Sequence, residues 1–212
     1  MITLQSFVLE TLTSEFVERL NFEFGPMRVY PSGYRNDIAG CIRNGRIRIT
    51  SDPSTISSSP SSVDADGSYA IDTPRGQIHP FFIHPRWTIL TGGELYLKDG
   101  LSGNESASLR GTIIHEATHA LQDWQRAQLD PPTAEGAAYL AGAIARRLWG
   151  YRTLGRIENP QASGHAYALT LADRFLAEPN GARRYHIPTD DVATLKSLVS
   201  TVHADRYVFN GI

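Results

Sequence analysis

The fold of this 212-residue chain is decided by one stretch, Ile113-Ile114-His115-Glu116-Ala117-Thr118-His119-Ala120-Leu121. An α-helix has 3.6 residues per turn, so His115 and His119 fall on one face and both imidazoles can reach the same metal ion. Apolar residues occupy another face, which predicts a helix over about residues 105–122 that packs on a core and presents its histidines to a cleft. Glu116 lies between the histidines, where a carboxylate can take a proton from a metal-bound water. The alternative is a buried helix whose histidines are only hydrogen-bonded.

A third metal ligand is expected further along the chain, because a catalytic zinc ion usually has three protein ligands and one water. Glu135 is the predicted ligand, in the first turn of a second helix over residues 133–149. Small residues around it would allow this helix to approach another closely. Its alternative role is a partner for the helix dipole. Asp130 is the rival ligand, although it directly precedes Pro131 and fits the role of an N-cap better.

The connection between the two helices has to be tight if Glu135 is to meet the histidines. A helix rises about 1.5 Å per residue, so one that continued from His119 to Leu129 would carry the chain about 15 Å past the metal. We therefore expect the first helix to end within about two turns of His119, and Asp130-Pro131-Pro132 to direct the return. Gln122 shares the stripe of the histidines, and Asp123 either supports a ligand or lies on a solvated face.

The whole chain, residues 1–212, is expected to form a single α+β domain. Residues 1–103 would supply an N-terminal helix and a sheet, with a flexible serine-rich loop at 51–68. Residues 104–212 would form a helical region that carries the active site.

Local patterns predict the remaining elements. Apolar spacing indicates a helix over residues 4–20, and Asn44-Gly45 is typical of the turn of a β-hairpin, here over residues 38–49. Short strands are expected between residues 78 and 101, including a half-buried strand at 94–97. Two more helices are expected near residues 162–177 and 190–203.

Composition narrows the function classes. The net charge of -2 argues against a nucleic-acid binder that relies on a basic surface. Cys41 is the only cysteine, which excludes an internal disulfide and a multi-cysteine zinc site. The basic pairs Arg146-Arg147 and Arg183-Arg184 are interpreted as solvated charges.

Neither a Sec-type signal peptide nor an apolar membrane span is visible, so a cytoplasmic protein is expected, with signal-independent export left open. The oligomeric state is not predicted.

The motif together with Glu135 resembles the zincin metallopeptidases, in the branch with a glutamate third ligand (gluzincins), over about residues 95–149. The metzincin branch is disfavoured because Gln122 and Gln125 stand where it has glycine and histidine. Compact bacterial metalloprotease effector or toxin domains are similar in size. The resemblance implies a small, twisted, mainly antiparallel sheet packed on the motif helix, and a lower strand, residues 94–97, that pairs with an extended peptide.

The expected function is hydrolysis of peptide bonds in a protein or peptide substrate. One Zn²⁺ ion would be held by His115, His119 and Glu135, with Glu116 as general base. Tyr139 is the nearest candidate to stabilise the oxyanion. Weaker candidates are His165, Tyr167, His186 and His203; His79 and His84 are assigned no ligand role. The alternatives are a non-catalytic zincin-like module that binds a partner protein, and a metal-dependent hydrolase of a non-peptide amide.

Overall fold

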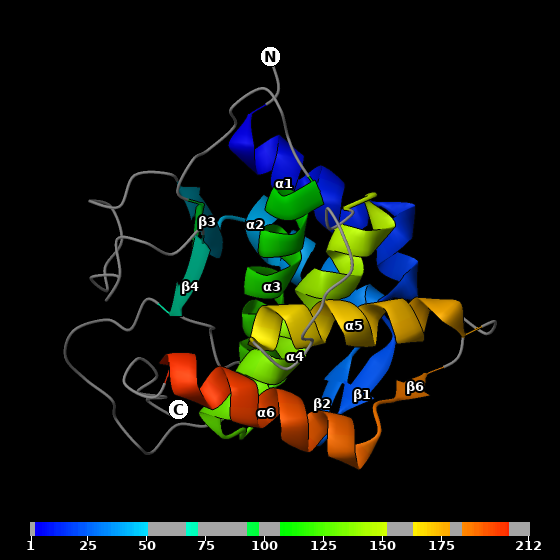
Figure 1. Cartoon of the computed structure of the whole chain (residues 1–212). Coiled ribbons are helices and arrows are strands. Elements are labelled where there is room, and N and C mark those ends of the chain that lie inside the picture. Colours follow the sequence, from blue (N-terminus) through cyan, green and yellow to red (C-terminus); the bar gives the residue numbers. More distant parts are fainter. Residues whose placement is uncertain are drawn as a thin grey trace, which may run out of the picture.

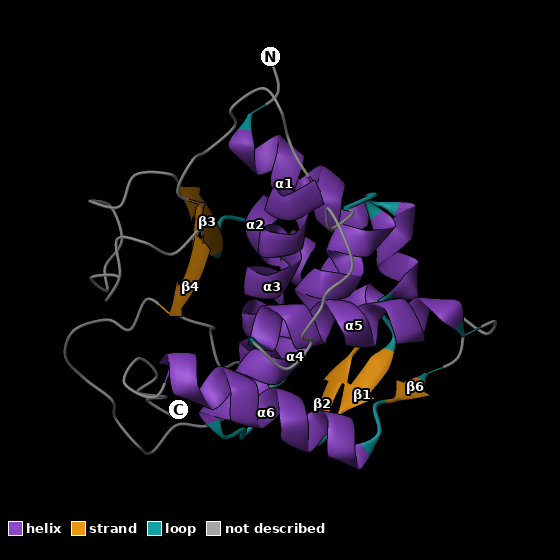
Figure 2. Cartoon of the chain, in the orientation of Figure 1, coloured by secondary structure: helices purple, strands orange, loops and turns teal. Residues whose placement is uncertain are grey.

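The computed structural model describes residues 3–50, 67–71, 93–97, 107–151, 163–178 and 184–203 (Figure 1). Over these residues the chain is mostly helical and carries two small three-stranded sheets (Figure 2). The predicted α+β class is therefore confirmed. No helix in the described part of the chain has the length and apolar character needed to cross a membrane.

The first predicted helix is real but shorter than expected. Helix α1 spans Leu4–Thr13 and is followed by a 3-10 helix, η1, at Glu15–Arg19. Ser14 separates them because its backbone is extended, with φ -65° and ψ 158°, and its side chain accepts a hydrogen bond from the Phe16 amide. A serine that caps the following turn thus ends the preceding helix.

The predicted hairpin at residues 38–49 is wrong. The chain instead forms a π-helical segment, η2 at Gly33–Ile38, then helix α2 at Ala39–Arg43 and strand β3 at Ile47–Thr50. Asn44-Gly45 terminates the helix: Gly45 has φ +75°, its amide donates to the Ile42 carbonyl at 3.2 Å, and the Arg46 amide donates to the Cys41 carbonyl at 2.8 Å. These two bonds define a Schellman motif, which requires the same positive φ as a hairpin turn.

One sheet lies beside the last helix and orders its strands β2-β1-β6. Strand β1 (Phe22–Phe24) pairs antiparallel with β2 (Met27–Val29) and parallel with β6 (Tyr185–His186). The rings of Phe22 and Phe24 are fully buried and anchor this sheet in the core.

The other sheet corrects the expected role of residues 94–97. These residues do form a strand, β5 at Gly93–Leu97, but the order is β3-β5-β4, with β5 parallel to β3 and antiparallel to β4 (Gly67–Ile71). The sheet is therefore mixed, not mainly antiparallel. Because β5 is paired on both sides, it has no free edge for a peptide. Among the described strands of this sheet, β3 and β4 are the edges.

Several predicted features lie outside the described residues. The serine-rich loop at 51–68 is one, except that Gly67 and Ser68 belong to β4. The strands expected between residues 78 and 92 are another, together with His79 and His84.

Two long helices form the centre of the molecule (Figure 1). Helix α3 spans Ala107–Trp124 and helix α4 spans Pro131–Leu148; α5 (Gly164–Ala177) and α6 (Thr189–His203) pack against α4. All four match predicted helices, and α3 ends within two turns of His119 as expected.

The return between α3 and α4 follows the predicted route. The Asp130 side chain accepts a hydrogen bond from the Thr133 amide at 2.9 Å, and Pro131 occupies the first helical position. Asp130 also pairs with Lys196 at 3.0 Å. This residue is therefore the N-cap of α4, which excludes it as a ligand.

Glycines let the two helices approach closely near Gly111 and Gly142. A Cβ atom added to Gly142 would lie 2.8 Å from the Gly111 carbonyl oxygen and 3.2 Å from the Cβ atom of His115. Backbone and side chain thus leave no room for a methyl group. This approach brings the histidine face of α3 within reach of short side chains on α4.

Candidate metal centre

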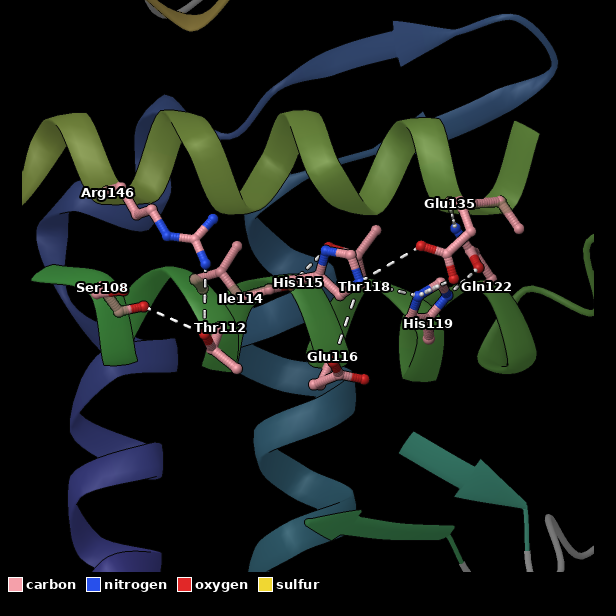
Figure 3. Close-up of polar contacts among 11 residues, drawn as sticks. Ser108, Thr112, Ile114, His115, Glu116, Thr118, His119, Gln122, Glu135 and Arg146 are labelled. Atoms are coloured by element: carbon pink, nitrogen blue, oxygen red, sulfur yellow. Dashed lines mark hydrogen bonds and ion pairs between the residues drawn. The ribbon is translucent and has the colours of Figure 1, made fainter. Parts of the chain in front are cut away.

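The structure brings together the three predicted ligands, two from α3 and one from α4 (Figure 3). His119 Nε2 lies 3.3 Å from Glu135 Oε1, and His115 Nε2 lies 3.6 Å from Glu135 Oε2. The two Nε2 atoms are 3.3 Å apart. One nitrogen from each histidine therefore lies close to one carboxylate group, and one ligand atom from each of the three residues lies within 4.8 Å of the others.

The shortest of these separations are those expected of donor atoms bound to one metal ion. Two metal–ligand bonds of about 2.0–2.1 Å that meet at a tetrahedral angle place their donor atoms about 3.3–3.4 Å apart. The two Nε2 atoms, and His119 Nε2 and Glu135 Oε1, are each separated by this distance, 3.3 Å. His115 Nε2 lies 3.6 Å from the other carboxylate oxygen, Oε2. Two imidazole nitrogens and one carboxylate oxygen are also a donor set that divalent transition metals accept. The group can hold one metal ion.

The antiparallel arrangement of α3 and α4 explains which residues meet. His115 faces Gly142 and Tyr139, while His119 faces Glu135, so positions later in α3 face positions earlier in α4. The close contact at Gly111 and Gly142 lies toward the start of α3. The contact between His119 and Glu135 lies at the end of α3, next to the tight return.

The cluster is buried at one end and open at the other. The side chains of Glu135 and His119 are 2% and 6% exposed, whereas that of His115 is 17% exposed. A water or substrate atom would therefore reach the cluster from the side of His115.

Charge at the buried end favours a cation. Burial alone would lower the pKa of His119, but the adjacent Glu135 carboxylate outweighs it and, with smaller help from Glu116 and Gln122, raises this pKa to about 9. In the metal-free protein, a proton on His119 balances part of this negative charge. The same two carboxylates would favour a divalent metal ion.

Glu116 is buried but stays outside the ligand cluster. Its Oε1 lies 3.9 Å from His115 Nε2, and Figure 3 shows it on the side of α3 that faces away from α4. The carboxylate is thus near the cluster without occupying a ligand position. Its role as a base for a metal-bound water stays a prediction.

Tyr139 lies one turn after Glu135, against the more exposed histidine. Its ring meets that of His115 edge to face, with centroids 5.0 Å apart at 80°. Burial and then the Glu135 carboxylate raise the pKa of Tyr139, with Arg146 opposing them. The phenol therefore stays protonated and can donate a hydrogen bond; its role in stabilising an oxyanion stays a prediction.

The other oxyanion candidates are placed by contacts with other parts of the chain. Tyr167 donates to Asp191 Oδ1 at 2.7 Å, which joins α5 to α6, and His186 on β6 pairs with Glu23 Oε2 at 2.9 Å. His165 lies in α5, where burial and then Arg146 and Arg147 lower its pKa. The side chain of His203 lies outside the described part of the structure.

Sequence reasoning missed two polar side chains between α3 and α4. Gln122 contacts a candidate ligand: its Oε1 lies 3.0 Å from His119 Nδ1. Its position three residues after His119, on the same stripe, was the available signal. Arg146, expected to be solvated, instead lies between the helices and donates to Thr112 Oγ1 at 3.3 Å. Arg147, also expected to be solvated, is 13% exposed and pairs with Asp173 Oδ2 at 2.7 Å. No local pattern in the sequence signals either contact.

Comparison of the chain with protein-family models, with curated proteins and with solved structures finds no match to any of them. The function must therefore be inferred from the site itself.

Proposed function

We propose that this protein is a zinc-dependent metallopeptidase. The observation that carries the proposal is the close grouping of His115, His119 and Glu135, which could hold one metal ion, with Glu116 buried beside them. Two histidines and one glutamate are a donor set of catalytic zinc sites, which leave one position for water. A purely structural zinc site usually has four protein ligands and no use for a neighbouring carboxylate.

Each residue of the site would have its own role in peptide hydrolysis. Zinc at this site would acidify a bound water and polarise the carbonyl group of the scissile bond. Glu116 would take the proton from the attacking water and pass it to the leaving amine nitrogen. Tyr139 would donate its phenolic hydrogen to the oxygen that becomes negatively charged. The substrate would approach from the exposed side of His115.

The topology of the second sheet changes where an extended substrate would pair. Strand addition needs a free edge, and β5 has none. Of the two edge strands of this sheet, β4 has the more extensive contact with α3. We therefore assign substrate pairing to Gly67–Ile71 in place of residues 94–97.

Metal analysis combined with one conservative substitution tests the proposal. The purified chain should contain one zinc ion, and profiling of the peptides that it cleaves should yield a specific set of products. Glu116→Gln should keep the zinc and lower kcat by about 10²–10⁴-fold, because only the base is removed. Glu23→Gln is the matched control, since Glu23 also lies beside a histidine but in β1.

Three results separate the alternatives. A native chain without bound metal would contradict the enzyme assignment. Bound zinc without cleavage of any peptide or protein would favour the partner-binding module. Cleavage of small amides but not of peptides, lost in Glu116→Gln, would favour the non-peptide hydrolase.

A further inference from the structure

Gln122 connects the two halves of the candidate metal centre. It lies in the last turn of α3 with 2% of its surface exposed. Its Oε1 is 3.0 Å from His119 Nδ1, and its Nε2 donates to the Ala134 carbonyl oxygen at 2.9 Å (Figure 3). Ala134 directly precedes Glu135. One buried side chain thus touches one ligand and the backbone next to another.

The chemistry of these contacts determines the proton on His119. A backbone carbonyl only accepts hydrogen bonds, so the amide nitrogen of Gln122 must face Ala134. The amide oxygen then faces His119, and because that oxygen also only accepts, Nδ1 of the imidazole must carry a hydrogen. The neutral imidazole is left with its lone pair on Nε2, which is the atom that faces His115 and Glu135.

We infer that Gln122 is a positioning residue of the metal centre: it fixes the Nδ1–H form and the ring orientation of His119, and it ties the first turn of α4 to α3 so that Glu135 meets the same ion. This inference rests on the metal site of the proposed function. Partners of this kind orient histidine ligands in metal sites, and their loss typically weakens metal binding about 10–100-fold.

A neutral amide suits this position better than the carboxylate often found there. Glu116 and Glu135 already place two negative charges around the cluster. A third would reduce the positive charge that a bound ion presents to water and to a carbonyl group. Gln122 orients the ring without adding that charge.

Three variants test the inference. Gln122→Met is close in volume and removes both contacts. Gln122→Glu keeps an acceptor for His119 Nδ1–H but loses the donor to the Ala134 carbonyl. Gln125→Met is the control, since Gln125 follows in the next turn and donates instead to the Arg28 carbonyl at 2.9 Å. Circular dichroism checks that each variant is folded.

Two readouts are measured on each variant. The first is zinc affinity, by competition with a chromophoric chelator. The second is the ¹H NMR resonance of His119 Nδ1–H and its exchange with water, with and without zinc. Gln122→Met should weaken zinc binding about 10–100-fold and remove the slowly exchanging Nδ1–H resonance. Gln122→Glu should keep that resonance while amide exchange in the first turn of α4 becomes faster. Gln125→Met should match the wild type in both.

The outcomes distinguish this inference from the proposed function. Wild-type zinc affinity and a protected Nδ1–H in Gln122→Met would overturn the inference while the metal site stands. Loss of that resonance in Gln122→Glu, in a folded protein, would also overturn it. A wild-type chain that binds no zinc would overturn the proposed function. The His119 Nδ1–H resonance, compared between the wild type and the Gln122 variants without zinc, would still decide whether Gln122 orients the imidazole.

Discussion

The two sides of the candidate metal cluster between α3 and α4 differ in the surroundings of their histidines. At the end near the helix return, His119 is buried, contacts Gln122 and faces Glu135. At the other end, His115 is more exposed and is covered on one side by the ring of Tyr139. The first end has the burial and hydrogen bonding that hold an ion in place. The second has the access that a reaction requires.

Under the proposed function, metal binding and chemistry would be divided between these two sides of the cluster. Changes at the buried end should act first on metal affinity. Changes at the open end should act first on turnover and leave the metal in place.

Glu135→Gln at the buried end should have the largest effect. It removes a negatively charged ligand, and if structural zinc sites gain about 10–16 kcal/mol from about four ligands, one ligand is worth about 3 kcal/mol, or more than about 100-fold in affinity. Zinc content and peptide cleavage should therefore fall together. Asp130→Asn is the control, because asparagine also caps helices and Asp130 is not a ligand. If Glu135→Gln retained all of its zinc, Glu135 would not be a metal ligand.

Tyr139→Phe at the open end should lower kcat by about 10²–10³-fold, the usual effect of losing one donor to an oxyanion. The ring that packs on His115 remains, so zinc affinity should not change. Steady-state kinetics together with zinc titration checks both expectations. Unchanged kcat would mean that Tyr139 only packs, and a loss of zinc would contradict the proposed division.

Gly142→Ala should disturb the open end through packing. The added Cβ would lie 2.8 Å from the Gly111 carbonyl oxygen, which belongs to backbone and cannot rotate away. We expect a loss of about 1–3 kcal/mol in the free energy of unfolding, measured by denaturant titration. Gly40→Ala in α2 is the control: nothing lies within 4 Å of its added Cβ, so stability should be unchanged or slightly higher. Equal stability of the two variants would contradict the close approach of α3 and α4.

A change of one pH unit should alter zinc affinity less than the substitutions of ligands and donors do. Burial opposes the charge on His119, but Glu135 prevails and holds its pKa at about 9 in the metal-free protein. Below that pH a metal must displace this proton, so zinc affinity should fall up to about tenfold per pH unit. Chelator competition across pH measures this slope. A pH-independent affinity would show that His119 binds no metal.

Stability of the metal-free chain should depend on pH through the same group. The folded pKa of His119, about 9, lies above the ordinary value of 6.5. Its contribution to stability is therefore fully present below pH 6.5 and is lost as the pH rises through 9. Denaturant titrations of the metal-free protein at pH values on both sides of this window measure the loss. Stability that rises with pH across the window would contradict the shift.

The site was predictable where its parts are close in sequence. His115, Glu116 and His119 follow from a motif spaced at helical periodicity. Glu135 follows from the need for a third ligand and from its place among small residues in the first turn of the next helix, and helix geometry then required the short return past Asp130. Gln122 was visible as part of the histidine stripe, but its link to Ala134 depends on how two helices pack.

The sheets were harder to predict for physical reasons. Asn44-Gly45 offers a positive φ that serves a hairpin turn and a helix end equally well, and packing of the helix that precedes it decided between them. Strand β5 was found from its alternation, but its place between β3 and β4 depends on partners distant in sequence. Local pattern carries no information about which strand becomes an edge.

The short return between Trp124 and Pro131 has a consequence for folding. All three candidate ligands lie in one helical hairpin, so the site needs only local contacts and the closure of a small loop. We expect such contacts to form before those between strands distant in sequence, such as β3 and β5. A metal ion could then be captured by the hairpin while the sheets are still unpaired, and its availability during synthesis would influence how fast the chain reaches its native state.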